Sequence, residues 1–149
     1  MPFPEPVPGL VIRYSYLWAE EYGSGREEGV KDRPCAIILV STDDGGERVV
    51  TVLPVTHTPP PDPGLAVEIP QVTKRRLGLD DERSWVVLAE ANRFVWPGPD
   101  LRLSGSLGRR GDAASVAYGQ LPYALFDTIR QKFIAAVRAR RAGIVPRSE

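Results

Sequence analysis

The sequence predicts a mainly β protein of the α+β class: a small curled antiparallel sheet or barrel with one long C-terminal helix packed on it. Short segments rich in β-branched and aromatic residues alternate with turns that contain proline or glycine, and one stretch with helical periodicity comes last. The chain has 149 residues, 42% of them hydrophobic. One domain over residues 1–149 can therefore bury a core without disulfides.

The first predicted strands include a hairpin. A proline-rich arm, residues 1–8, leads to an alternating segment at 10–17 that predicts a half-buried strand. The apolar run 34–40 predicts a buried strand. Two aspartates and two glycines at 43–46 predict a turn, which pairs this strand with 48–55.

Shorter elements are predicted in the middle of the chain. Prolines at 59–63 cannot donate hydrogen bonds to a strand ladder, so this stretch predicts a loop. The elements predicted after it are strands at 66–69, 85–89 and 92–96 and a helical turn within 71–83. Residues 104–119, rich in Gly, Ser and Ala, predict a loop or a short strand.

The clearest helix is predicted over 122–142. Its apolar side chains recur every four residues and predict one buried face; they are Leu125, Ile129, Phe133 and Val137, with Phe126 and Ile134 widening the stripe. Pro122 suits the first helical turn, and Gly143 with Pro146 indicates the stop.

Composition narrows the classes of function. The only cysteine, Cys35, lies in the most apolar predicted strand, and nothing resembles a secretory signal, so we expect a cytoplasmic protein. No apolar run approaches the roughly 20 residues that span a bilayer, so no membrane partner is expected. One histidine and one cysteine, with no metal-binding spacing, predict neither a metal site nor a cofactor.

Charge is balanced overall but unevenly placed. The formal net charge is zero, whereas residues 101–149 carry nine basic and three acidic side chains. This pattern fits either a solvated basic helix face or a local track for RNA.

Polar side chains at the ends of the hairpin are the main candidates for chemistry. Arg33 precedes the buried strand and Thr56 ends its partner, so the hairpin brings the two close together. A guanidinium can pair with two phosphate oxygens and never loses its charge. Arg33 could instead be held in a structural ion pair with a carboxylate such as Glu27, Glu28 or Asp32, and Thr56 could cap the next turn.

These residues resemble a known family. A loop containing Gly29, then Arg33-Pro34 at the start of a strand and Pro54-Val55-Thr56 at the end of a later one, resembles the PemK/MazF family of toxin endoribonucleases from toxin–antitoxin systems. The resemblance covers residues 8 to 140. It implies an SH3-like barrel and metal-independent, sequence-specific cleavage of single-stranded RNA to 2′,3′-cyclic phosphate and 5′-OH ends.

The resemblance also assigns roles to residues. It implies a catalytic function for Arg33, Thr56 and Glu90, where Glu90 could act as a base toward the ribose 2′-OH or orient Arg33. Further candidates for contact with RNA are Trp18, Glu28, His57, Asn92 and Arg93. Trp18 could stack on an unpaired base. His57 could transfer protons near neutral pH, although the family does not in general depend on a histidine here.

Partners and alternatives follow from the same resemblance. It implies a cognate antitoxin and a homodimer, and the large apolar side chains Trp85, Phe94, Trp96 and Tyr123 exceed what one small core needs. The acidic loop before Arg33 and the zero net charge depart from the family pattern and weaken attraction to RNA. A non-catalytic SH3-like binding module, a gyrase-directed toxin of the same fold and an unrelated small enzyme therefore stay open.

Overall fold

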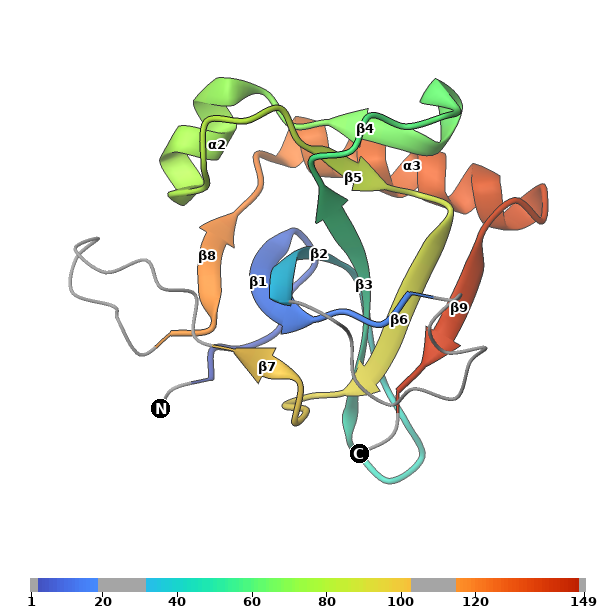
Figure 1. Ribbon diagram of the computed structural model, residues 1–149. Coiled ribbons are helices and arrows are strands. Elements are labelled where there is room, and N and C mark those ends of the chain that lie inside the picture. Colours follow the sequence, from blue (N-terminus) through green and yellow to red (C-terminus); the bar gives the residue numbers. More distant parts are fainter. Residues whose placement is uncertain (1–2, 19–31, 103–114, 148–149) are drawn as a thin grey trace.

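The computed structural model describes residues 3–18, 32–102 and 115–147 (Figure 1). This part of the chain forms a mainly antiparallel sheet with two α-helices, one of them C-terminal, which confirms the mainly β class. The strands are β1 (Leu10–Ser15), β2 (Asp32–Thr42), β3 (Arg48–Thr56), β4 (Ala66–Glu68), β5 (Trp85–Val87), β6 (Glu90–Val95), β7 (Leu101–Arg102), β8 (Ala117–Gln120) and β9 (Gly143–Pro146). The helices are a 3₁₀ turn, η1 (Pro63–Leu65), with α2 (Gln71–Leu77) and α3 (Tyr123–Arg138). None of the helices described is long and apolar enough to cross a bilayer.

The central hairpin organises the sheet. Strands pair in the order β4-β5-β3-β2-β1-β7, with β6 also on β3, β8 also on β1, and β9 parallel to β6. Among the described strands no pairing joins β4 to β7, so the sheet is not closed into the barrel that the sequence predicts. The edge of β1 is shared between β7 and β8, and β7 has only two residues to pair.

The predicted hairpin and its turn are confirmed. Cys35 pairs with Pro54 and Ile37 with Val52, and the register shifts between Ile37 and Leu39. In the turn, the Asp43 carboxylate accepts hydrogen bonds from the backbone N–H groups of Gly45 and Glu47, both at 2.9 Å. An aspartate that satisfies its own turn in this way fixes the loop length and so the register of both strands.

The middle of β2, from Cys35 to Ile38, is apolar because both faces of the strand are buried there. Ala36 and Ile38 belong to a core cluster that includes side chains of α3, which covers one face of the sheet (Figure 1). Cys35 and Ile37 belong to a second cluster, whose aromatic members are Tyr14, Tyr16, Phe94 and Trp96. Side chains alternate across a strand, so successive residues supply opposite cores.

The buried face of α3 overlaps the predicted one only in part. The buried side chains are those of Phe126, Ile129, Phe133 and Ala136, whereas Ile134 and Val137 are exposed by 39% and 41%. The prediction used a period of four residues. A straight helix turns once in about 3.6 residues, so a buried stripe steps by three as well as four.

The end of α3 also corrects the prediction of a helix to residue 142. Arg140 adopts the left-handed conformation with φ of 59°. Its N–H donates to the carbonyl of Val137 at 3.0 Å, and that of Arg141 donates to the carbonyl of Ala136 at 2.8 Å. These two bonds form a Schellman motif, which ends the helix early. The predicted stop at Gly143 and Pro146 is instead strand β9.

A buried arginine attaches the chain beyond β9 to the sheet. The guanidinium of Arg147, 8% exposed, donates to the Asp100 carboxylate at 2.8 Å, to the carbonyl of Ser15 at 2.9 Å and to the side-chain oxygen of Asn92 at 3.0 Å. It also lies 5.3 Å from the centre of the Tyr14 ring. Buried charges are tolerated when they are paired and hydrogen-bonded in this way.

Replacement of Arg140 by Gly should raise the free energy of unfolding by about 1 kcal/mol, because glycine adopts a positive φ without a clash with its Cβ. Urea denaturation measures the change. The matched control is Arg138→Gly inside the last helical turn, which should lower the free energy of unfolding by about 1 kcal/mol. Equal destabilisation by both substitutions would show that the Schellman motif does not form.

Candidate active site at the end of the central hairpin

Arg33 lies near the start of β2, beside the end of β3. Its Nη1 donates a hydrogen bond to the carbonyl oxygen of Val55 at 3.4 Å. Its guanidinium carbon lies 5.0 Å from the centre of the Trp18 ring, a cation–π contact. Its Nε is buried without a hydrogen-bond partner among the described residues. The end of β3 and the Trp18 ring thus fix the plane of the Arg33 guanidinium. Most of the N–H donors of this group have no acceptor among the described residues.

A cavity of about 440 Å³ opens beside Arg33. The side chains around it that carry polar chemistry include Arg13, Arg33, Thr56, His57, Lys74 and Tyr118. Two carboxylates, those of Asp32 and Asp80, also line it. The structure therefore brings together three residues that the sequence singled out: Arg33, Thr56 and His57.

Both carboxylates of the cavity already have cationic partners. Asp32 lies 3.8 Å from Arg13 and 3.6 Å from Arg102, and Asp80 lies 2.6 Å from the ammonium of Lys74. Arg33 has no carboxylate partner among the described residues, so the proposed pair with Asp32 does not form. An anion that entered the cavity would therefore meet Arg33 as the unpaired cation.

Thr56 does cap the turn that follows β3. Its Oγ1 accepts a hydrogen bond from the backbone N–H of Thr58 at 3.1 Å. The hydroxyl hydrogen is not used in that bond and can donate to a ligand in the cavity. Turn capping and ligand binding are thus compatible at this residue.

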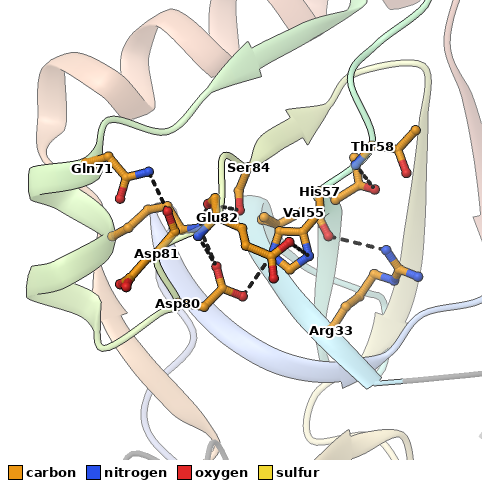
Figure 2. Close-up of polar contacts among 11 residues, drawn as sticks. Arg33, Val55, His57, Thr58, Gln71, Asp80, Asp81, Glu82 and Ser84 are labelled. Atoms are coloured by element: carbon orange, nitrogen blue, oxygen red, sulfur yellow. Dashed lines mark hydrogen bonds and ion pairs between the residues drawn. The ribbon is translucent and has the colours of Figure 1, made fainter.

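His57 is held by two carboxylates on the loop after α2. Its Nε2 lies 2.8 Å from Asp80 Oδ2, and its Nδ1 lies 3.8 Å from Glu82 Oε1. Figure 2 shows Asp80 and Glu82 approaching the imidazole from one side, with Arg33 reaching the end of β3 from the other. A hydrogen bond from Nε2–H to Asp80 leaves Nδ1 with the lone pair, which is the arrangement of a general base.

Lys74 fixes the loop that carries these carboxylates. Its side chain is 1% exposed, and its ammonium donates to Asp80 and to Ser84 Oγ, both at 2.6 Å, and to the carbonyl of Glu82. Partial burial pushes the pKa of Asp80 upward, but the hydrogen bond and the charge of Lys74 outweigh it, so this pKa is lowered from its ordinary value. Lys74 thereby keeps the Asp80 carboxylate ionised, and this carboxylate faces His57.

The same group has the composition of a metal site. The ligand atoms of His57, Asp80 and Glu82 lie within 4.8 Å of one another, and all three side chains are exposed. The ammonium of Lys74 already neutralises Asp80 from its other oxygen and would repel a cation bound there. The arrangement therefore suits the orientation of an imidazole better than the binding of a divalent ion.

The remaining predicted site residues that the structure describes do not line the cavity. Glu90, at the start of β6, accepts a hydrogen bond from the Tyr16 hydroxyl at 3.1 Å. Burial first, and then the charge of Glu90, raise the pKa of Tyr16, so the phenol stays protonated as the donor. Trp18 stacks edge-on against Tyr16 with ring centres 5.1 Å apart. Tyr16 thus connects Glu90 to Trp18, and Glu90 does not line the cavity with Arg33.

Asn92 and Arg93 belong to β6, away from the cavity. Asn92 is fully buried; its amide exchanges hydrogen bonds with the backbone of Leu17 at 2.8 and 2.9 Å and accepts one from Arg147. Its amide therefore supports the fold. Arg93 is exposed on the same strand. Glu28 lies outside the described residues.

One further expectation is corrected and another is confirmed. Trp85, Phe94 and Trp96 are exposed by 8%, 3% and 8%, so they pack within the chain and do not supply the apolar excess expected at a dimer interface. Tyr123 is exposed by 73%. Cys35 is fully buried, and burial raises the pKa of its thiol, which removes it as a nucleophile.

Sequence reasoning missed Lys74, Asp80 and Tyr118. A lysine in Lys74-Arg75-Arg76 has the pattern of a solvated helix face, and only the packing of α2 shows which of the three is buried. The pairing of Asp80 with His57 joins positions 23 residues apart, and no local pattern marks such a contact.

Comparison of the chain with protein-family models, with curated proteins and with solved structures found no match.

Asp80→Asn should make stability less dependent on pH. The pKa of Asp80 is lowered from 3.8 in the folded protein, so its contribution is present above about pH 4 and is lost as the pH falls through the folded-state pKa. The difference in unfolding free energy between parent and variant should therefore stay constant above about pH 5 and shrink as the pH falls below about 4. Urea denaturation across this range measures it, with Asp44→Asn in the hairpin turn as control. A difference that stays constant would contradict the ion pair.

Proposed function

We propose that this protein is a metal-independent endoribonuclease that cleaves single-stranded RNA to 2′,3′-cyclic phosphate and 5′-OH ends, as the toxin of a toxin–antitoxin system. The observation that carries the proposal is the position of Arg33. It faces the cavity without a carboxylate partner among the described residues, and its plane is fixed by Trp18 beside Thr56. Preorganised cations of this kind stabilise the charge that develops on a phosphate.

In the proposed reaction, the ribose 2′-oxygen attacks the adjacent phosphorus. The new 2′-O–P bond forms as the P–O5′ bond breaks, and the leaving O5′ takes a proton from solvent. Arg33 donates to the non-bridging oxygens, whose negative charge grows in the five-coordinate transition state. The Thr56 hydroxyl donates to the same phosphate or holds the strand for in-line attack.

His57 is the proposed general base. Its Nδ1 takes the proton of the 2′-OH, and Asp80 stabilises the imidazolium that results. Lys74 acts through Asp80 and is a positioning residue. Glu90, which the family resemblance also suggests as a base, is hydrogen-bonded to Tyr16 and does not line the cavity, so it ranks second.

The proposal includes the partners that the resemblance implies: a cognate antitoxin, a homodimer and a location in the cytoplasm. It also includes a relation to the SH3-like folds of that family, which a small antiparallel sheet with a C-terminal helix supports. RNA binding without cleavage is the outcome that would favour a non-catalytic module instead.

Arg33→Ala should lower kcat/KM for RNA cleavage by about 100- to 1000-fold, the usual effect of removing one preorganised donor. Cleavage is measured in EDTA on a mixed RNA pool, with mapping of new 5′-OH ends. Arg48→Ala, at the opposite end of the hairpin, is the matched control and should cleave like the parent. Arg33→Ala at the parental rate would show that the site is wrongly assigned, and dependence on added metal would exclude the mechanism.

The pH dependence separates the two candidate bases. If His57 is the base, the rate should rise with pH as the imidazole loses its proton, and His57→Gln should abolish that limb of the profile. Glu90→Gln should keep it. Loss of this limb in Glu90→Gln but not in His57→Gln would assign the role of general base to Glu90.

A further inference from the structure

A second hollow, of about 340 Å³, adjoins the active-site cavity and shares Thr56 and Thr58 with it. Its lining is mostly apolar: Trp18, Pro59, Pro60, Pro61, Trp85 and Ala89 are among the residues around it. The phosphate site proposed at Arg33 and this apolar hollow therefore lie on two sides of one turn, at the end of β3.

The walls of the hollow are preorganised. Three consecutive prolines, from Pro59 to Pro61, restrict φ along one wall. The turn before them is held by the hydrogen bond from Thr58 N–H to Thr56 Oγ1. A flat ligand could enter without ordering this part of the chain first, which lowers the cost of binding.

The charged group at the rim is already engaged. The carboxylate of Asp62 accepts a hydrogen bond from Gly64 N–H at 2.9 Å and pairs with Arg141; these bonds lower the pKa of Asp62. The hollow thus offers aromatic and aliphatic surface with few free polar groups. It suits a planar apolar face and not a second phosphate.

Trp18 joins the two hollows. Its ring contributes to the apolar lining and also contacts the Arg33 guanidinium at 5.0 Å. A ligand that reaches both places must carry an anionic group and a flat ring within a short distance. A nucleotide of single-stranded RNA has this composition, with its base one sugar away from its phosphate.

We propose that the hollow lined by Trp18, Pro59–Pro61 and Trp85 is a nucleobase subsite, which takes one unpaired base next to the phosphate held at Arg33. This inference rests on the proposed function for the position of that phosphate. With few free polar groups in the lining, the subsite binds by stacking and shape and accepts any of the four bases. It also requires an unpaired strand, because a base within a duplex cannot reach it.

Binding of abasic RNA tests the subsite without relying on cleavage. The probe is a short single-stranded RNA with 2′-O-methyl sugars, which cannot be cleaved through the 2′-OH, and a matched set in which each position in turn lacks its base. Affinities are measured in EDTA by fluorescence anisotropy. For the parent protein, one abasic position should weaken binding by about 5- to 150-fold, the range for loss of one stacked base.

Three variants locate that effect. In Trp18→Ala the penalty for the abasic position should disappear, whereas Trp18→Phe should keep most of it. Ala89→Leu, which narrows the hollow from its wall, should weaken binding of intact RNA and leave abasic RNA unaffected. Tyr123→Ala, an exposed aromatic on α3, is the control and should keep the full penalty. Thermal melting identifies any variant that fails to fold.

The outcomes separate this inference from the proposed function. Cleavage by the parent together with an unchanged abasic penalty in Trp18→Ala and Ala89→Leu would overturn the subsite alone. A penalty that depends on Trp18 in a protein that does not cleave RNA would support the subsite and overturn the nuclease. Equal affinity for intact and abasic RNA would overturn the subsite. It would favour an apolar side chain of a protein partner as the occupant of the hollow.

Discussion

The pairing register of β2 with β3 is the constraint on which the candidate site depends. Cys35 lies opposite Pro54 at the end of the paired register, and two residues further along each strand Arg33 and Thr56 both line the cavity. The Asp43 turn at the other end fixes this register through its own hydrogen bonds. A slip of one residue would move every side chain of β2 to the opposite face, exchanging two different cores. The packing on both faces of the sheet therefore maintains the geometry of the site.

Two buried cations hold the elements around this hairpin. Lys74 positions the loop after α2, so that Asp80 reaches His57. Arg147 ties the end of the chain to Asp100 and Asn92 across the aromatic core. Each charge is satisfied by several oxygen acceptors, which is the condition under which a buried cation is tolerated. Arg33 differs, because its charge faces a cavity and has no such set of acceptors among the described residues.

The sequence predicted the order and type of the longer elements well. The hairpin, its turn and the C-terminal helix follow from patterns within about ten residues, where alternation, apolar period and turn chemistry act directly. The end of α3 and strand β9 were mispredicted. Arg140 does not have the glycine signal of a left-handed cap, and a parallel edge strand such as β9 is stabilised by its partner, with little signal in its own four residues.

By itself the sequence determined the hairpin, the burial of Cys35 and the nearness of Arg33 to Thr56, because these depend on neighbours along one strand pair. Only the tertiary structure decided which polar residues share the cavity. It brought His57 to Asp80 beside a buried Lys74, placed Glu90 against Tyr16 outside the cavity, and buried Asn92 with Arg147. These contacts join residues from separate elements, and their energies depend on burial and charge pairing that a linear pattern does not contain.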